Sequence, residues 1–463
     1  MVQAPGESKE TVIADSRPAS GPVTREPARA SSGRPRVVIV GAGFGGLTLA
    51  RSLRGARVDV TLVDRSNYHL FTPLLYQVAS SLLNPSEIAQ PVRKLLRKVR
   101  NCTFHLAEVL DVDLEQRCIN TNQGPIPYDY LVLAAGSVSN YFGNDGLREH
   151  SLGLKTLPDA LALRNWVLQR FEMASWEPDP ERRAQLITFT VVGGGPTGVE
   201  FAGALLELIH LVLTKDFRDV DISAAQVLLV EAASDLLGGF KPRLRQAATR
   251  SLSGRGVKVL LNSPVRSIES DRLTLSDGRV LPTTSVVWTA GVRGAPLGAR
   301  LGTDLDRNGK VPVSSTLQLA DHPEVLVIGD LAGLDDLPML AQVAIQQARL
   351  AARNILALVE GRALAGFRYR DRGIMATVGR NSGIAQIGPF QFSGFIGWVL
   401  WLVVHLVNIL TFRARVITLL NWAWDYLAVD RPIRLLVRAR PVGAAGEGTP
   451  MVSPEKTGHS NLD

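Results

Sequence analysis

Two glycine-rich loops, each directly after an apolar run, constrain the fold of this chain more than any other feature. The first loop, residues 41–46, follows the run 37–40, and the second, residues 193–198, follows the run 187–192. In such a strand–loop–helix unit the glycines allow a tight turn, approach of a pyrophosphate to the backbone, and close helix–strand packing. The sequence therefore predicts an α/β fold with two Rossmann-like dinucleotide-binding domains. The expected binding residues in the loops are Gly41, Gly43, Phe44, Gly45, Gly46, Gly193, Gly195, Pro196, Thr197 and Gly198.

A carboxylate ends the second strand of each unit, at Asp64 and at Glu231. A carboxylate at this position accepts hydrogen bonds from an adenosine ribose and repels a 2′-phosphate. Alanines occupy positions 232 and 233, so no arginine stands there to hold that phosphate. The second unit is therefore expected to prefer NADH to NADPH. Arg65, next to Asp64, is also expected among the cofactor-binding residues.

Three further strand-like segments, 128–136, 285–291 and 325–330, end in small residues or in a Gly-Asp pair. A carboxylate in the last pair is expected to bind the ribityl chain of FAD. A helix from Pro338 to about Glu360 would aim its positive end at the flavin. FAD is thus assigned to the first unit and NADH to the second. The contacts expected from these segments are Ala135, Gly136, Ala290, Gly291, Gly329 and Asp330.

Composition excludes several classes of mechanism. Cys102 and Cys118 form neither a CxxC pair nor a ligand cluster, so no redox-active dithiol and no metal site are expected. The first 35 residues contain no apolar core, so we expect a disordered tail there rather than a signal peptide. The formal net charge of +8 admits nucleic acid or anionic lipid as a partner, and its location must decide between them.

The C-terminal region places positive charge beside the most apolar segment. Residues 381–412 contain no Lys, Arg, Asp or Glu, and 393–410 are apolar apart from a few residues such as His405 and Asn408. Six arginines and two aspartates follow within 413–440, interspersed with aromatic residues. This combination is typical of an anchor that lies on an anionic bilayer, and we favour it over a spanning helix, which stays open. Nucleic acid is not expected as a partner.

A basic helical stretch at 93–100 either assists membrane binding or is a solvated face. The expected location is the cytoplasmic face of the cell membrane. The predicted limits are 36–150 with 312–385 for a split FAD-binding domain, 151–311 for an NADH-binding domain, 386–440 for a helical membrane-association region, and disordered tails at 1–35 and 441–463.

Four segments together resemble the type II, non-proton-pumping NADH dehydrogenases of the glutathione-reductase-like flavoproteins. They are the two glycine loops, the segment 327–330 and the AQVAIQ segment 341–346. The resemblance covers residues 36 to about 440. It implies non-covalent FAD, hydride from NADH on one side of the flavin, and a membrane quinone near the other.

The resemblance also assigns roles to individual residues. It places Ala341, Gln342, Val343 and Gln346 at the flavin and the quinone site, and the two glutamines share one helix face. Glu200 lies where nicotinamide meets flavin, and it either relays a proton to the quinone or only positions groups. The same region is expected to include Phe71, Pro73, Tyr76 and Gln77.

Other functions remain open on sequence grounds. A sulfide:quinone oxidoreductase shares scaffold and anchor but needs cysteines that carry sulfur near the flavin. A soluble NADH-dependent reductase of a ferredoxin-like protein would not need the apolar C-terminal region. A redox sensor of the apoptosis-inducing-factor kind would react slowly with quinone. A homodimer is a further partner that the sequence leaves open.

Overall fold

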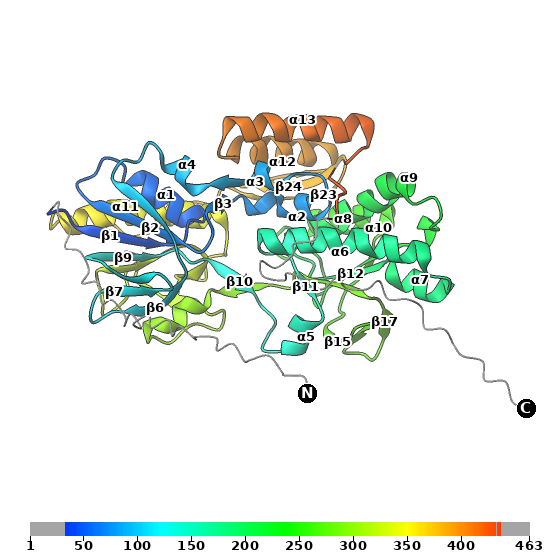
Figure 1. The fold of residues 1–463 in the computed structure, drawn as a ribbon, viewed down its shortest axis with the longest axis horizontal. Coiled ribbons are helices and arrows are strands. Elements are labelled where there is room, and N and C mark those ends of the chain that lie inside the picture. The colour runs from blue at the N-terminus through cyan, green and yellow to red at the C-terminus, as the bar shows by residue number, and fades with distance from the viewer. Residues whose placement is uncertain (1–32, 432, 437–463) are drawn as a thin grey trace, which may run out of the picture.

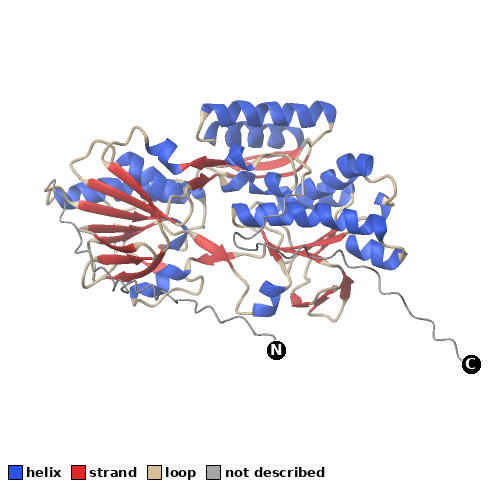
Figure 2. Cartoon of the chain, viewed as in Figure 1, coloured by secondary structure: helices blue, strands red, loops and turns tan. Residues whose placement is uncertain are grey.

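The computed structural model describes residues 33–431 and 433–436, which form two lobes with a layer of helices above their junction (Figure 1). The tails predicted at 1–35 and 441–463 lie outside the described residues, apart from 33–35. The strands of the two lobes gather into separate sheets, and two long C-terminal helices lie outside both (Figure 2).

The first lobe contains a parallel five-stranded sheet in the order β21-β9-β1-β2-β5. Its central strand β1 is apolar on both faces because helices cover one face and a β-meander covers the other. The strand β21 reaches this sheet only after the chain has passed through the second lobe, as a split domain requires. The elements are β1 (Arg36–Val40), α1 (Phe44–Ser52), β2 (Asp59–Asp64), α4 (Val92–Leu96), β5 (Cys102–Leu106), the meander β6 (Val109–Asp113), β7 (Cys118–Thr121) and β8 (Gly124–Pro127), then β9 (Tyr130–Leu133), β20 (Val311–Pro312), β21 (Val325–Val327), β22 (Ala332–Gly333) and α11 (Ala341–Val359).

The second lobe repeats this plan with a parallel sheet in the order β11-β18-β12-β13-β14. The two sheets confirm the predicted fold class. The elements are α5 (Asp145–Glu149), β11 (Leu152–Gly153), α6 (Leu157–Trp176), α7 (Pro180–Leu186), β12 (Thr188–Val192), α8 (Pro196–Glu207), α9 (Thr214–Asp216), β13 (Gln226–Val230), α10 (Pro242–Arg255), β14 (Lys258–Leu260), β15 (Val265–Ile268), β16 (Arg272–Leu275), β17 (Val280–Pro282) and β18 (Ser285–Trp288).

Two short antiparallel strands, β10 (Ser137–Ser139) and β19 (Val292–Gly294), join the lobes. Strand β10 follows β9 of the first sheet and β19 follows β18 of the second. The two crossings of the chain between the lobes therefore run side by side.

The upper layer combines the C-terminal region with a segment of the first lobe. An antiparallel three-stranded sheet leads into two helices, and the predicted domain limit at residue 385 falls inside one of its strands. The layer shares its hydrophobic core with α6 and α8 of the second lobe. Its elements are β3 (Tyr68–Leu70), α2 (Leu75–Ala79), α3 (Pro85–Ile88), β4 (Ala89–Pro91), β23 (Ile374–Gly379), β24 (Ser382–Ile387), β25 (Phe390–Ser393), α12 (Gly394–Asn408) and α13 (Phe412–Ala428).

Two of the described helical stretches are apolar enough to be considered as membrane spans, and their burial and length argue against both. In the described part of the chain, one helical stretch, Pro196–Asp216, is long and apolar enough to span a bilayer, but 72% of its apolar 18-residue window is buried inside the protein. Helix α12 has 15 residues and is therefore about 22 Å long, short of the roughly 30 Å of a hydrocarbon core. Nδ1 of His405 and Nδ2 of Asn408 bond the carbonyls of Trp401 and Val404 four residues earlier, so one polar atom of each side chain is satisfied within the helix.

Candidate active site

Both glycine loops have the backbone geometry that a pyrophosphate site needs. Gly41 and Gly193 turn with φ of +102° and +110°, which favours glycine. A Cβ at Gly46 would collide with the carbonyl of Gly41, and the same holds for Gly198 over Gly193. Around Gly43 and Gly195, by contrast, a Cβ would meet no described atom within 4 Å. The backbone there is open to a ligand, so both loops fit a dinucleotide phosphate.

The two carboxylates predicted to bind ribose are tied to their own loops. Oδ2 of Asp64 accepts from the Ala42 N–H at 2.6 Å, and Oδ1 accepts from Ser66 at 2.7 Å. Glu231 matches this arrangement, accepting from the N–H of Gly194 at 2.5 Å and of Ala233 at 2.8 Å. Burial raises the pKa of Asp64, against the opposing effect of these backbone donors. Arg65, by contrast, is exposed.

The segments that end β9 and β18 meet at the crossing between the lobes. The carbonyl of Gly136 accepts from Ala295 at 3.0 Å, and the carbonyl of Gly291 accepts from Asn140 at 3.0 Å. The predicted residues Ala135 and Ala290 stand beside these two glycines. Cofactor segments of the two lobes are therefore bonded to each other's linker.

Asp330 belongs to a polar cluster at the same crossing. Its Oδ2 accepts from the hydroxyl of Ser137 at 2.6 Å, and that hydroxyl accepts from Nζ of Lys155 at 2.8 Å. Burial lowers the pKa of Lys155, partly offset by the carboxylate of Asp330 at 3.9 Å. The N–H of Gly329 donates to Oε1 of Gln347 at 2.7 Å, which joins the Gly-Asp pair to α11.

Helix α11 begins at Ala341, so the predicted start at Pro338 was wrong. The chain at Leu340 is still extended, with φ of −122° and ψ of 144°, and Leu340 bonds back to the Pro338 carbonyl. Pro338 therefore belongs to a turn before the helix. The predicted end was right, because Gly361 follows the last helical turn with φ of +65°. Ala341, Gln342 and Val343 thus form the first turn.

Gln342 and Gln346 lie on one helix face, but their amide groups already have backbone partners. Gln342 donates to the carbonyl of Gly373 at 3.1 Å and accepts from the Arg372 N–H at 3.1 Å. Gln346 donates to the Arg370 carbonyl at 2.9 Å and accepts from its N–H at 3.0 Å. The two glutamines fasten the irregular segment 370–373 along the first two turns of α11.

Glu200, in the second turn of α8, is buried beneath the upper layer. Its Oε1 accepts from the Thr377 N–H at 3.2 Å and from Nε1 of Trp401 at 3.0 Å. Burial raises the pKa of Glu200 to about 8, with these two donors opposing the shift. The carboxyl group is therefore mostly protonated at neutral pH.

An aromatic series connects this carboxyl group with the first glycine loop. The ring of Trp401 stacks on His405 at 4.0 Å, His405 faces Phe71 at 6.3 Å, and Phe71 faces Phe44 at 5.9 Å. Burial lowers the pKa of His405 to about 4, so its ring is neutral at physiological pH. Tyr76 also packs on Trp401, at 6.2 Å. The predicted residues Phe71 and Tyr76 thus line this region with the C-terminal helix.

Several contacts here were not predicted from the sequence, and Trp422, expected at the depth of the lipid headgroups, is instead buried. Trp422 donates to Oε1 of Gln77 at 2.8 Å. Arg431 is buried and pairs with Glu207 and Asp425, each at 3.1 Å. The spacing of Trp401 and His405, four apart on a helix, was available in the sequence. The partners of Arg431 were not, because they come from different elements.

Part of the positive charge that follows the apolar helix is engaged in ion pairs within the protein. Arg431 forms ion pairs with Glu207 and Asp425, and Arg434 forms ion pairs with Asp216 and Asp430. Within the described residues, Arg413 and Arg415 make no ion pair. Arg438 and Arg440 lie outside the described residues.

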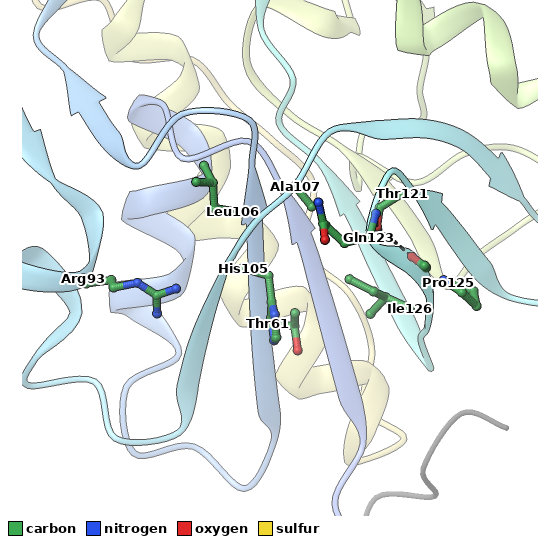
Figure 3. A pocket seen from close by; sticks show the side chains of 10 residues that line it. Thr61, Arg93, His105, Leu106, Ala107, Thr121, Gln123, Pro125 and Ile126 are labelled. Atoms are coloured by element: carbon green, nitrogen blue, oxygen red, sulfur yellow. Dashed lines mark hydrogen bonds between the residues drawn. The ribbon is translucent and has the colours of Figure 1, made fainter. Parts of the chain in front are cut away.

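A hollow of about 470 Å³ lies apart from the glycine loops, between β5 and the meander (Figure 3). Figure 3 shows Thr61 and His105 on neighbouring strands, with Gln123 and Ile126 on the meander. Its ten lining residues contain neither a carboxylate nor a cysteine.

The two cysteines are ill suited to carrying sulfur. Both are free and partly buried, on β5 and β7 of the first lobe. Burial raises the pKa of Cys102 to about 11 and also raises that of Cys118, so both remain protonated thiols at neutral pH.

Comparison with known proteins agrees with this geometry. Residues 35–348 match the pyridine nucleotide-disulphide oxidoreductase family. A type II NADH:quinone oxidoreductase of Mycobacterium tuberculosis is 43% identical over 424 residues, covering 88% of this chain and 91% of the relative. The chain belongs to the type II NADH:quinone oxidoreductases. A second such enzyme of M. tuberculosis is 40% identical, covering 87% of this chain and 89% of the relative.

Solved structures of lower identity share the fold. NDH2 of Plasmodium falciparum in complex with NADH superposes with a TM-score of 0.80 at 19% identity, covering 88% of this chain and all of that one. The sulfide:quinone oxidoreductase of Aquifex aeolicus superposes with a TM-score of 0.67 at 19% identity, covering 87% and 96%. Fold alone therefore does not separate these two activities, whereas sequence identity places this chain among the type II NADH:quinone oxidoreductases.

Proposed function

We propose that this chain oxidises NADH and reduces a membrane quinone through non-covalently bound FAD, without pumping protons. When bound, FAD supplies the chemistry that accepts a hydride from NADH and passes electrons to the quinone. The observation that carries the proposal is the position of Glu200. It follows the second glycine loop on α8 and contacts the C-terminal helix through Trp401.

The open backbone of each glycine loop holds one dinucleotide. Gly43 and Asp64 bind the phosphates and ribose of FAD in the first lobe, and Asp330 binds its ribityl chain. Gly195 and Glu231 do the same for NADH in the second lobe. Supporting contacts come from the remaining residues of both loops, Ala135, Gly136, Ala290, Gly291, Gly329, Ala341 and Val343. Because Asp64 and Glu231 each retain unused acceptor capacity beside the loop, a ribose hydroxyl can add to the existing bonds.

The two glutamines hold in place the backbone beside the proposed quinone site. Gln342 and Gln346 hold segment 370–373 by paired hydrogen bonds, and β23 with Thr377 follows directly. Their fixed amides keep that segment, and the donor it offers to Glu200, in place. A remaining N–H on each amide is available to a quinone carbonyl.

Glu200 holds a proton for the quinone. Reduction of a quinone consumes two protons, and a carboxyl group with a pKa of about 8 carries one at neutral pH. It loses this proton as the pH rises through 8, so proton supply is expected to fall on the alkaline side.

The outer surfaces of α12 and α13 bind the lipid. Apolar side chains including Phe395, Val403, Phe412, Leu420 and Trp424 are at least half exposed there, and such a continuous apolar face marks a membrane or protein contact. A short apolar helix beside a second amphipathic one suits a protein that lies on the bilayer at its cytoplasmic face. A homodimer remains a further proposed partner, which sedimentation in detergent tests.

Anaerobic mixing of the purified holoprotein with NADH, then with a short-chain benzoquinone, tests the function. NADH is expected to bleach the flavin absorbance, sulfide is expected to leave it unchanged, and quinone is expected to restore it. Reoxidation by a ferredoxin but not by quinone would make the protein a soluble-type reductase. Slow reoxidation by quinone would indicate a redox sensor.

A further inference from the structure

We propose that Trp401 of α12 is a positioning residue that holds the Glu200 carboxyl group for proton transfer, so that the membrane-facing helix completes the active site. The inference rests on the proposed proton role of Glu200. It concerns a different residue on a different element, whose outer face belongs to the proposed lipid surface.

The contact is specific in geometry. The indole N–H of Trp401 donates to Oε1 of Glu200 at 3.0 Å, and both side chains are buried, with 1% and 8% of their surface exposed. Nε1 is the single polar atom of an indole and it needs a partner when buried. A tryptophan placed only for packing would not require a carboxyl group at this point.

Glycines bring the two helices close enough for this contact. A Cβ at Gly203 on α8 would lie 2.7 Å from the carbonyl oxygen of Val378 on β23, so α8 rests directly on that strand. On α12, a Cβ at Gly397 would collide with the carbonyl of Gly383 on β24. Glu200 lies one turn from the first contact and Trp401 one turn from the second. The sheet therefore fixes the spacing of donor and acceptor.

Opposite faces of α12 have opposite surroundings. Ile396, Val399, Val403 and Val407 follow one another at helical spacing and are exposed. Gly397 and Trp401 lie on the inner face, where Trp401 is flanked by Tyr76, His405 and Trp422. Binding of the outer face of α12 to a bilayer therefore also keeps Trp401 in hydrogen-bonding position to Glu200.

The titratable groups near Glu200 do not explain a shift in the pH at which its carboxyl group loses the proton. Tyr76 on α2 is buried, which raises its pKa well above 10, and it stays neutral. His405 on α12 is neutral for the reason given above. The carboxylate of Glu207 on α8 forms ion pairs with Arg255 and Arg431. Strand β23 contributes only the Thr377 N–H.

The test compares Trp401→Phe with wild type and with Trp398→Phe, a neighbour on α12 that packs on Phe395 and Tyr426. The measurement is the rate at which the short-chain benzoquinone reoxidises NADH-reduced holoenzyme between pH 6 and 10. Loss of a donor to the ionised carboxylate raises its pKa, so the alkaline fall in rate is expected to move up by about one pH unit in Trp401→Phe. Trp398→Phe is expected to match wild type.

Glu200→Gln separates this inference from the function beneath it. If Glu200→Gln abolishes the alkaline fall and Trp401→Phe leaves it at the wild-type pH, the positioning role of Trp401 is overturned. If Glu200→Gln leaves the fall unchanged, the proton role of Glu200 is overturned and this inference with it. Should Trp401→Phe fail to fold, Gly397→Ala pushes α12 from β24 and is expected to give the same upward move, and an unmoved profile overturns the proposal.

Discussion

Replacing Arg431 with glutamine tests whether the end of the described chain fastens the upper layer to the second lobe. The side chain is 2% exposed. Its guanidinium pairs with Glu207 on α8 and with Asp425 on α13, each at 3.1 Å. It also donates to the carbonyls of Ser80 at 3.1 Å and Ala204 at 3.0 Å. One group thus joins α13, α8 and the end of α2.

The expected loss of stability follows from the carboxylates and carbonyls that lose their partner. Glutamine cannot reach all four partners. Asp425 then loses its ion pair with Arg431, and the half-buried Glu207 keeps only its pair with Arg255. Removing one member of a buried ion pair costs about 3–5 kcal/mol. At about 2 °C per kcal/mol for a chain of this size, the thermal midpoint is expected to fall by roughly 6–10 °C.

Thermal unfolding of the holoprotein, followed by tryptophan fluorescence, measures the change, and limited proteolysis locates it. Cleavage is expected to begin in α12 and α13 before the first lobe. Arg413→Gln is the control, because Arg413 is exposed and makes no ion pair among the described residues, and it is expected to unfold within 1 °C of wild type. A midpoint for Arg431→Gln equal to that of the control would refute the reasoning.

Three further predictions address the cofactor site, the buried acid and the membrane surface. Glu231→Gln weakens the bonds to the second loop and to ribose, so the KM for NADH is expected to rise about tenfold with little change in FAD content, and steady-state kinetics with flavin absorbance checks both. Glu200 has a raised pKa when folded, so its folded form binds more protons, and wild-type stability is expected to decline as the pH rises from about 4.5 to about 8. Glu200→Gln should show a flatter decline in denaturant unfolding over that range, and an equally steep one would contradict the pKa. Val403→Glu puts a charge on the outer face of α12, and its binding to anionic vesicles in a flotation assay is expected to weaken about fivefold, whereas Val280→Glu, equally exposed on β17, should bind as wild type.

The sequence alone was sufficient for the two sheets and their loops. A strand that ends in a glycine loop and opens a helix leaves few alternatives, and Gly41 and Gly193 adopt the positive φ that such a turn requires. The start of α11 was misplaced by three residues because Pro338 is compatible with both a first helical position and the turn that it forms. Propensity cannot distinguish the two when the deciding bond is made by the backbone of Leu340.

Gln342 and Gln346 show that a local sequence pattern predicts the face of a helix but not what that face contacts. Their spacing predicted a shared face of the helix, and they share one. What that face meets depends on segment 370–373, which returns from the far end of α11 to bond both amides. The ion pairs of Arg431 with Glu207 and of Arg434 with Asp216 show the same limit, since both carboxylates lie on distant elements of the second lobe.

What the sequence determined by itself is the pair of dinucleotide loops, because hydrogen bonding and steric contact within a few residues fix them. What only the tertiary structure decided is the environment of Glu200. Its burial, its raised pKa and its bond to Trp401 arise where α8, β23 and α12 pack together across about 200 residues of chain. Desolvation depends on what covers a group, and that cover comes from parts of the chain that no local pattern connects.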